Sequence, residues 1–433
     1  MHRAAELGVN ASVNGIDFGT LRDYRLRVVK TMVGGLAGLL AHRGITVFRA
    51  NAAFHADETA PATSNHIVHL VPSPDQSDIL TYHKADVPEP SGPTMDLTAT
   101  NIVIATGAKP RPLPGNPFAG ALIDSTQALE VNEFPSSAVI IGAGAIALEF
   151  ASMWNAAGSK VTLLIRKDRV LSAWDRRAGT TLTRELKRHG VNIITRASVT
   201  HVDTGANLGA TVHYTREGQD GEQSVWGEIA LVAIGRDPIT DPAWGVTIDD
   251  HGHVATDAYG RTDKPGVWAV GDVTAGHALA HRAFEQGIVI AETIAGLNPK
   301  PVDEATVPQI VFSFPEAASV GLTVEQAQAR EDLIEIKETN YPMLANARML
   351  MSGTAGSLTI VSGCDAANPD TPRVLGVHMI SQMASDIIAE AEQLVGNHVP
   401  LADAARLVHP HPTFSETLGE ALLKADGRPL HTR

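Results

Sequence analysis

The stretch Val139-Ile-Ile-Gly142-Ala-Gly144-Ala-Ile-Ala147-Leu-Glu149 decides the fold. It indicates a buried strand, a glycine turn and the start of a helix, and a second aliphatic run follows at residues 160–165. In such a unit Gly142 permits a tight turn, Gly144 lets a pyrophosphate approach the backbone, and Ala147 keeps the helix close to the sheet. We therefore predict a βαβ unit that binds a dinucleotide. The alternative is a glycine turn that is needed only for packing.

The end of the second strand bears on which nicotinamide dinucleotide would bind. An NAD site usually has an acidic side chain there, which binds the ribose 2′-hydroxyl, but this chain has Ile165 followed by Arg166 and Lys167. Two cations can neutralise the 2′-phosphate of NADP(H), and Arg offers forked donors to it. The residues favour NADP(H). The alternative is that both are exposed turn cations and that Asp168 serves the ribose of NAD.

Further aliphatic runs that end in glycine or a turn alternate with helical patterns, which predicts an α/β class built on parallel sheets. The predicted strands, buried on both faces, are residues 101–107, 138–142, 228–235 and 266–271; the predicted helices are residues 146–157, 178–189 and 278–295. Residues 211–214 and 224–226 predict an antiparallel ribbon. Five prolines between residues 72 and 95 predict a loop.

The last part of the chain, from residue 304, predicts a separate α+β domain of roughly 130 residues. Its predicted strands are residues 310–314, 358–361 and 374–380, and its predicted helices are residues 384–395 and 415–425. Prolines and an asparagine between residues 297 and 308 separate it from the preceding helix.

Length and composition exclude several classes of protein. The chain has 433 residues, which suggests two to three domains, and its net charge of −14 argues against binding to nucleic acid or to an anionic membrane surface. Its best apolar run is about half of the ~20 residues that a membrane span needs, so we expect a cytoplasmic protein. Cys364 is the single cysteine, so neither an intramolecular disulfide nor a thiolate metal cluster can form within these residues.

Together these segments resemble the flavoprotein pyridine nucleotide-disulfide oxidoreductases, and within them the dihydrolipoamide dehydrogenases. The resemblance rests on the glycine turn above and on Ala105-Thr-Gly107, Ala233-Ile-Gly-Arg236, Trp268-Ala-Val-Gly-Asp272, Leu279-Ala-His281, Ser319-Val-Gly321 and His409-Pro-His-Pro-Thr-Phe-Ser-Glu416. It implies two Rossmann-like FAD/NAD(P)-binding domains, the first incomplete, and a C-terminal α+β dimerisation domain. The expected boundaries are 1–133 for part of the FAD domain, 134–258 for the NAD(P) domain, 259–303 for the return of the FAD domain, and 304–433 for dimerisation.

The resemblance also implies the cofactor sites. Asp272 would bind the flavin ribityl chain, and a helix opening at residues 278–281 would direct its N-terminal dipole at the flavin's pyrimidine edge. The alternative is a simple helix cap with a surface Asp. The full set expected at FAD or NAD(P) is Thr106, Gly107, Gly142, Gly144, Ala147, Glu149, Arg166, Lys167, Gly235, Asp272, Ala278, Leu279, Ala280 and His281.

His411 and Glu416 resemble the family's acid–base pair, which serves the flavin of the neighbouring subunit and so implies a homodimer. An imidazole can take a proton from a dithiol, and a carboxylate can fix its tautomer. The alternative is that Thr413-Phe-Ser-Glu416 is a capping box. The remaining histidines, such as His66, His69, His251 and His253, lack zinc-motif spacing; we expect them to face solvent and expect no metal site.

Family members begin with a flavin-binding strand, a glycine turn, and a helix with two cysteines and a nearby lysine, and these features are absent here. Cys364 is predicted to lie in a polar turn and is expected to take no part in the redox chemistry. Glu149 would pair with the absent lysine, or it is a first-turn acid favoured by the helix dipole. We therefore expect an FAD- and NAD(P)-dependent oxidoreductase whose substrate is a small dithiol or a lipoyl domain. We also expect the activity of the given residues to be defective, because the redox cysteine pair is missing from them. The alternatives are an NADPH-dependent glutathione-like disulfide reductase and a non-catalytic, nucleotide-binding dimeric remnant.

Overall fold

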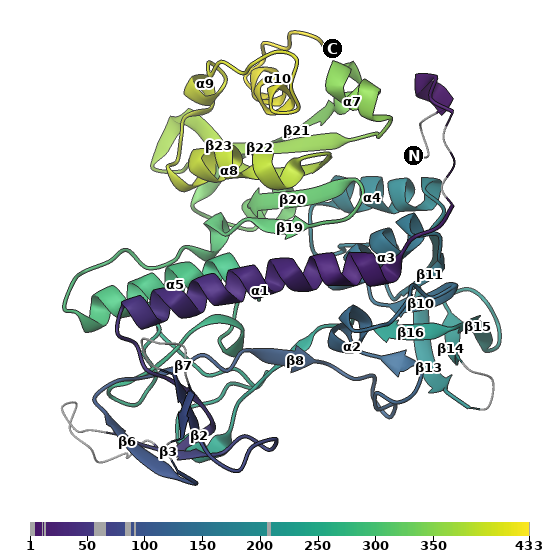
Figure 1. The fold of residues 1–433 in the computed structure, drawn as a ribbon. Coiled ribbons are helices and arrows are strands. Elements are labelled where there is room, and N and C mark those ends of the chain that lie inside the picture. Colours follow the sequence, from purple (N-terminus) through teal and green to yellow (C-terminus); the bar gives the residue numbers. More distant parts are fainter. Residues whose placement is uncertain are drawn as a thin grey trace. The chain divides into compact units, whose positions relative to one another are not determined.

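The fold is described from a computed structural model, which covers residues 5–10, 12, 14–55, 66–82, 88–90, 92–205 and 209–432 (Figure 1). The chain divides into two compact units, Met1–Lys109 with Pro238–Val302, and Pro110–Asp237 with Asp303–Arg433. Short strands β8 (Ala108–Pro110) and β17 (Arg236–Pro238) contain the crossing points. Among the described helices, none has both the length and the apolarity that a membrane span requires.

A five-stranded sheet organises the first half of the second unit, and all of its pairings are parallel. This confirms the α/β class. In spatial order its strands are β12 (Asn192–Thr195), β11 (Lys160–Ile165), β10 (Ser137–Ile141), β16 (Ile229–Val232) and β9 (Leu122–Ile123). The helices of this part are α2 (Ser125–Leu129), α3 (Ala145–Ala156) and α4 (Arg176–Arg188).

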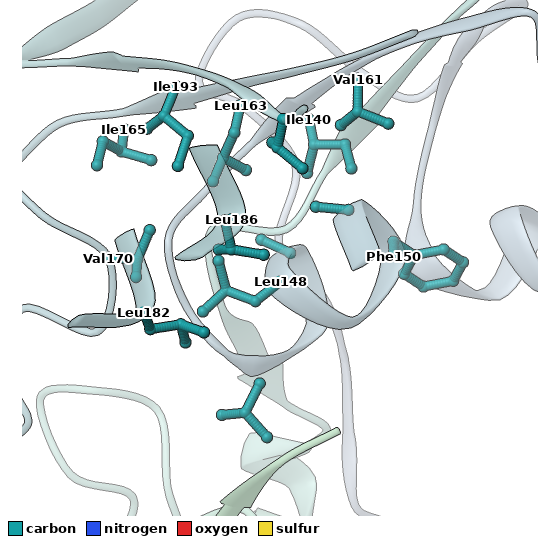
Figure 2. Packing of buried hydrophobic residues seen from close by; sticks show 14 of the residues in the cluster. Ile140, Leu148, Phe150, Val161, Leu163, Ile165, Val170, Leu182, Leu186 and Ile193 are labelled. Atoms are coloured by element: carbon teal, nitrogen blue, oxygen red, sulfur yellow. The ribbon is translucent and has the colours of Figure 1, made fainter. Parts of the chain in front are cut away.

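The core of this sheet lies between its strands and α3 and α4. Figure 2 shows strand side chains such as Ile140 and Leu163 directed toward Leu148 of α3 and Leu182 of α4, and all four are completely buried. Fully burying one such side chain contributes about 1.5–3 kcal/mol. The glycine turn that joins β10 to α3 is therefore supported by a buried hydrophobic core on this face of the sheet.

The predicted ribbon is confirmed as a three-stranded antiparallel sheet, β13 (Ala197–Asp203), β14 (Ala210–Arg216) and β15 (Gln223–Gly227). Alternation along β14 buries Val212 and Tyr214 against one face of the parallel sheet, so His213 between them lies on the opposite face.

The second half of this unit is a five-stranded antiparallel sheet with helices. The mixture of strands and helices agrees with the predicted α+β composition, but the strands at residues 316–321 and 333–342 were not predicted. Cys364 lies within its strand β22, fully buried and paired with Ile334, so the predicted polar turn at this residue is wrong. In spatial order the strands are β19 (Gln309–Val311), β20 (Glu316–Gly321), β23 (Asn368–Ser381), β22 (Ser357–Asp365) and β21 (Leu333–Pro342). The helices are η4 (Glu304–Thr306), α6 (Val324–Gln328), η5 (Met343–Ala345), α7 (Ala347–Ser352), α8 (Ala384–Gly396), α9 (Leu401–Ala404) and α10 (Glu416–Ala425).

The first unit contains two three-stranded antiparallel sheets and one parallel pair of strands. The sheets are β1 (Val47–Arg49), β4 (Leu80–Tyr82) and β5 (Pro88–Pro90); β2 (Asn51–Phe54), β3 (His66–Val71) and β6 (Met95–Ala99); and β7 (Ile102–Ile104) with β18 (Val267–Ala269). The helices are η1 (Ala5–Leu7), α1 (Phe18–His42), η2 (Pro242–Trp244), η3 (Gly271–Val273) and α5 (Ala280–Ile294).

Three predictions for this unit are wrong. The expected loop at residues 72–95 contains β4 and β5, because prolines are tolerated on an edge strand, which β5 is. Strand β7 is not buried on both faces, since Val103 is 44% exposed. His66 is buried, and its Nε2 bonds the carbonyl of Pro265 at 3.0 Å, so it does not face solvent.

Candidate functional site

The turn after β10 is built around a close backbone approach. Gly142 has φ +140°, and a Cβ there would lie 2.1 Å from the carbonyl oxygen of Ala233 and 3.5 Å from the Cβ of Ala147. Ala147 is itself completely buried. The position accepts only glycine, and the small residue at 147 lets α3 begin against the sheet.

Gly144 differs from Gly142, because a Cβ at this residue would meet no atom within 4 Å. It is the N-cap of α3, is exposed, and supplies no side-chain cap. The first backbone N–H groups of the helix therefore lack side-chain acceptors and carry the positive end of its dipole. Open space beside such donors fits the pyrophosphate of a dinucleotide.

At the end of β11 the place of the expected acid is occupied by Ile165, which is completely buried. Arg166 and Lys167 follow it, both exposed, and neither forms an ion pair with any residue that the structure describes. The carboxylate of Asp168 forms ion pairs with the guanidinium groups of Arg169, at 3.1 Å, and of Arg176, at 4.0 Å. With no ion-pair partner among the described residues, the two cations can bind an anionic ligand, whereas the carboxylate of Asp168 is shared with two arginines.

Glu149 lies in the second turn of α3, so the alternative of a first-turn acid is wrong. Its Oε1 accepts a hydrogen bond of 3.0 Å from the N–H of Phe312. Burial raises the pKa of the Glu149 carboxyl, and the bond from Phe312 opposes part of that rise. The chain thus contains a half-buried carboxylate without a cationic partner among the described residues.

Gly235 and Arg111 lie in the same unit and bond each other. Gly235 has φ +126°, its carbonyl accepts from the N–H of Arg111 at 3.1 Å, and Arg111 pairs with Asp237 at 2.6 Å. The positive φ explains the glycine on conformational grounds.

In the first unit, β7 leads to Thr106 and Gly107. The hydroxyl of Thr106 donates to the carbonyl of Ile239 at 2.7 Å, and the carbonyl of Gly107 accepts from the N–H of Ile239 at 2.9 Å. Both residues therefore connect two chain segments that are distant in sequence, whatever ligand they meet.

Asp272 lies in η3, directly after β18. Its carboxylate is half-buried and has no protein partner within the described residues. The N–H of Gly271 donates to Gln286 of α5 at 2.9 Å, which joins η3 to that helix. An acceptor held in this way suits the hydroxyls of a ribityl chain.

Helix α5 begins at Ala280, with Leu279 as an N-cap that makes no side-chain cap bond. Ala278 and Leu279 precede the helix, so the prediction that it opens at residue 278 is wrong by two residues. Ala280 and His281 form the start of the first turn of α5, and the N-cap residue Leu279 supplies no side-chain acceptor to this turn. Such a turn can donate to an electron-rich group.

His411 and Glu416 are brought together. The Nδ1–H of His411 donates to Oε2 of Glu416 over 2.6 Å, while the imidazole is 75% exposed and the carboxylate 16% exposed. Because Nδ1 carries the proton of this bond, Nε2 is left to accept one. The capping-box alternative is formed in one half only. The N–H of Glu416 donates to Oγ1 of Thr413 at 3.2 Å, whereas the Glu416 carboxylate bonds Asn346 and His411 and makes no return bond to Thr413 among the described residues.

Asn346 completes this pair and was missed by the sequence analysis. Its Nδ2 donates to Oε1 of Glu416 at 2.7 Å and to the carbonyl of Thr413 at 3.0 Å, while its Oδ1 caps α7. Both carboxylate oxygens of Glu416 are therefore held by side chains. No local motif could have revealed Asn346, because it lies 70 residues from Glu416 in the chain.

His409 was also missed as a partner. Its Nε2–H donates to Oε1 of Glu390 at 2.9 Å, and this bond raises the pKa of the His409 imidazole. The ring is nearly buried, so His409 and Glu390 fix the segment that leads to His411.

Comparison with known proteins decides the family. Residues 3–287 match the family described as pyridine nucleotide-disulphide oxidoreductase, and residues 307–422 match the dimerisation domain of the same family. The chain belongs to the pyridine nucleotide-disulphide oxidoreductases. It is 31% identical over 431 residues to a dihydrolipoyl dehydrogenase of Geobacillus stearothermophilus, covering 98% of this chain and 84% of the relative. A dihydrolipoyl dehydrogenase of Cupriavidus necator is 37% identical over 341 residues, covering 77% and 70%.

Solved structures agree with this oxidoreductase in fold. LpdA of Mycobacterium tuberculosis superposes with a TM-score of 0.82 at 24% identity, over 98% of this chain and 86% of that one. The flavoprotein disulfide reductase RclA of Escherichia coli gives a TM-score of 0.67 at 26% identity, over 76% and 74%. The expected class is confirmed: an FAD-dependent oxidoreductase that uses a nicotinamide cofactor, with a dimerisation domain at its C-terminal end.

Proposed function

We propose that this oxidoreductase transfers electrons between a nicotinamide dinucleotide and a dithiol or disulfide in the manner of a dihydrolipoyl dehydrogenase. The observation that carries the proposal is the bond of 2.6 Å between His411 and Glu416, with Asn346 on the second carboxylate oxygen. It orients an exposed imidazole whose Nε2 can take a proton from a thiol. The relatives named dihydrolipoyl dehydrogenase support the lipoyl class of substrate.

The nicotinamide dinucleotide is proposed to bind at the turn of Gly142 and Gly144, with Arg166 and Lys167 on the 2′-phosphate of NADP(H). Support comes from the open space at Gly144 and from the two cations, which have no ion-pair partner among the described residues. Arg166→Glu should weaken binding of NADPH more than binding of NADH, since only NADPH carries the 2′-phosphate. Lys160→Glu is the matched control, because it makes the same charge change at the other end of β11. Equal losses for both dinucleotides would refute the assignment.

FAD is proposed to bind in the first unit, at Asp272, at the first turn of α5 and beside Thr106 and Gly107. The fit rests on the carboxylate of Asp272, which has no partner within the described residues, and on α5, whose N-cap Leu279 makes no side-chain cap bond. When bound, FAD supplies two-electron chemistry between nicotinamide and sulfur. Asp272 would accept hydroxyl hydrogen bonds, and the N–H groups at Ala280 and His281 would donate to the cofactor's electron-rich edge.

The proton-transfer role of His411 can be separated from a structural one. In the protein as its native cell produces it, His411→Gln should lower kcat for dihydrolipoamide by about 10²–10⁴-fold while leaving NADPH binding unchanged. The matched control is His431→Gln, because the His431 imidazole forms a similar exposed pair with Glu420 of α10, at 2.8 Å. Equal activity of the two variants would remove His411 from the mechanism.

A homodimer is proposed from the dimerisation domain and from the apolar side chains that this domain leaves exposed. The exposed residues include Leu344, Leu350, Met351, Met383, Leu407 and Val408. A second copy of the chain would cover such surface, because large exposed apolar patches mark interaction sites. Sedimentation of the purified chain tests this directly, and a monomer at micromolar concentration would contradict it.

The 433 residues contain Cys364 alone, whose thiol is buried and has its pKa raised by that burial. We propose that these residues by themselves do not complete dithiol turnover. The chain should bind NADPH and show no lipoamide-dependent nicotinamide reduction when FAD is added. Full turnover would refute this proposal, and a chain that retains no FAD would favour a non-catalytic remnant. The intact mass of the native protein, compared with 45.8 kDa, tests for further residues.

The second candidate is an NADPH-dependent disulfide reductase of the glutathione type. The observation in its favour is the pair of cations after Ile165, where an NAD enzyme would have an acid. Turnover of the native protein with glutathione disulfide, compared with lipoamide and with NADPH as the dinucleotide in both assays, separates the two. Preference for lipoamide supports the first proposal.

A further inference from the structure

Imidazoles and carboxylates gather on the outer face of the sheet formed by β13, β14 and β15. Figure 1 shows the backbone of this sheet. His201 of β13 and His213 of β14 are direct cross-strand partners, and Asp203 lies two residues after His201 on the same face. Glu222 immediately precedes β15. Because Val212 and Tyr214 occupy the buried face of β14, period-two alternation leaves this group on the solvent side.

The two imidazole rings are stacked, with centroids 4.1 Å apart and planes inclined by 9°. Both Nε2 atoms lie near the same oxygen, Oδ2 of Asp203, at 3.1 Å for His213 and 3.9 Å for His201. Both Nδ1 atoms lie near Glu222, at 3.5 Å for His213 and 3.8 Å for His201. The carboxylate of Asp203 therefore faces the Nε2 edge of the two stacked rings, and the carboxylate of Glu222 faces their Nδ1 edge.

We propose that His201, Asp203 and His213 form a binding site for a divalent transition metal ion of the zinc class. The candidate ligand atoms of these three residues all lie within 4.8 Å of one another. A tetrahedral ion with bonds of about 2.0–2.1 Å places its ligand atoms roughly 3.3–3.4 Å apart. The distances from Asp203 to the two imidazoles, 3.1 and 3.9 Å, lie on either side of that value.

Glu222 acts as the supporting carboxylate of this site. Nδ1 of His201 lies 3.3 Å from the hydroxyl of Thr200, and Glu222 lies 3.5 and 3.8 Å from the two Nδ1 atoms. A proton held on this side leaves the lone pair that ligates a metal on Nε2, and at His213 the ion would replace the proton that Nε2 shares with Asp203 at 3.1 Å. Thr200 donates to Oε1 of Glu222 at 2.6 Å and so holds that carboxylate in place. Ion binding tilts the imidazoles from parallel, and their partial exposure, 46% for His201 and 23% for His213, leaves room for this movement.

The donor set selects among ions. Two imidazole nitrogens and one carboxylate suit zinc and its neighbours in the transition series, whereas magnesium and calcium prefer oxygen ligands. Three protein ligands leave the fourth position open to water. The bound ion would connect β13 to β14 and stabilise the ribbon by mass action.

The test is a zinc titration of the full chain after treatment with a chelator, by calorimetry, with magnesium as the competitor that should not displace zinc. We expect one zinc ion per chain at this site. His213→Ala and Asp203→Asn should each weaken zinc binding at least about tenfold, because the loss of a mere outer-shell partner already costs about 10–100-fold. Glu222→Gln should fall within that outer-shell range.

His69→Ala is the matched control, since its imidazole forms an isolated exposed pair with Asp96, at 2.6 Å, and should leave zinc affinity unchanged. Thermal unfolding without metal checks that every variant is folded; the substituted side chains lie on the solvent face, so we expect little change. The proposal is overturned if the wild-type chain binds no zinc stoichiometrically. It is equally overturned if His213→Ala and Asp203→Asn bind zinc as the wild type does, since the ion then lies elsewhere.

Discussion

Replacing each glycine of the nucleotide turn separately by alanine should give opposite results. In Gly142→Ala the new Cβ would lie 2.1 Å from the carbonyl oxygen and 2.8 Å from the carbonyl carbon of Ala233. Ala233 is fixed by its own N–H bond to Ile141, at 2.8 Å, so the collision is not relieved by a flexible side chain. Overpacking costs about 1–3 kcal/mol and a disfavoured positive φ about 1–3 kcal/mol. We expect roughly 2–6 kcal/mol of destabilisation.

Gly144→Ala introduces the same methyl group without that cost. The residue has φ −91° and ψ −176°, which any residue adopts, and its Cβ would meet nothing within 4 Å. Alanine is a poorer N-cap than glycine, so stability should fall by no more than about 1 kcal/mol. The methyl group enters the space proposed for the pyrophosphate, and NADPH affinity should fall at least about tenfold, which corresponds to about 1.4 kcal/mol.

Urea denaturation followed by tryptophan fluorescence measures the first effect, because Trp154 of α3 lies completely buried in the core that supports both glycines. Fluorescence titration with NADPH measures the second. A Gly142→Ala chain with an unchanged urea midpoint would refute the close-approach argument. A Gly144→Ala chain with wild-type NADPH affinity would show that the pyrophosphate does not occupy the open space.

Three further predictions concern stability and reactivity. Glu390→Gln should destabilise the fold by about 1.5 kcal/mol at pH 6, which is near the lower limit for a hydrogen bond to a charged group. The bond from Glu390 raises the pKa of His409, so its contribution to stability is fully present below 6.5, the ordinary pKa of histidine. The loss should shrink as pH rises through the raised value, and an equal loss at pH 9 in thermal unfolding would contradict this. Gly419→Ala should destabilise by about 1–3 kcal/mol despite a better helix propensity, since its Cβ would lie 2.3 Å from Nδ1 of His409; unchanged thermal stability would show that the ring gives way. Cys364 should react with a thiol reagent only as fast as the chain unfolds, and rapid labelling of the native protein would contradict its burial.

Much of the fold could be predicted because its signals are local. The turn from Gly142 to Ala147 combines strand, glycine and helix signals within one short segment, and the structure forms the predicted βαβ unit. Strand β5 could not be predicted in this way, because Pro88 and Pro90 are compatible with a strand only at a sheet edge, and edge position is a property of the assembled sheet.

Cys364 illustrates the same limit in the core. Its neighbours Gly363 and Asp365 are turn formers, yet β22 is central in its sheet and pairs on both sides, which buries the thiol. Local composition describes only the segment itself, whereas burial depends on strands contributed from elsewhere.

The candidate site shows why two hypotheses for one residue could not be separated from the sequence. Glu416 suited both a capping box and an acid–base pair, because both patterns need only residues within five positions of it. The deciding contact comes from Asn346, which the end of β21 and the start of α7 bring beside α10. Asn346 bonds Oε1 and His411 bonds Oε2, and these two contacts direct the carboxylate toward the acid–base pair. The pair of His201 and His213 could not be predicted from the sequence for the same reason. The two residues are twelve positions apart, and only the register of β13 and β14 brings their imidazoles face to face.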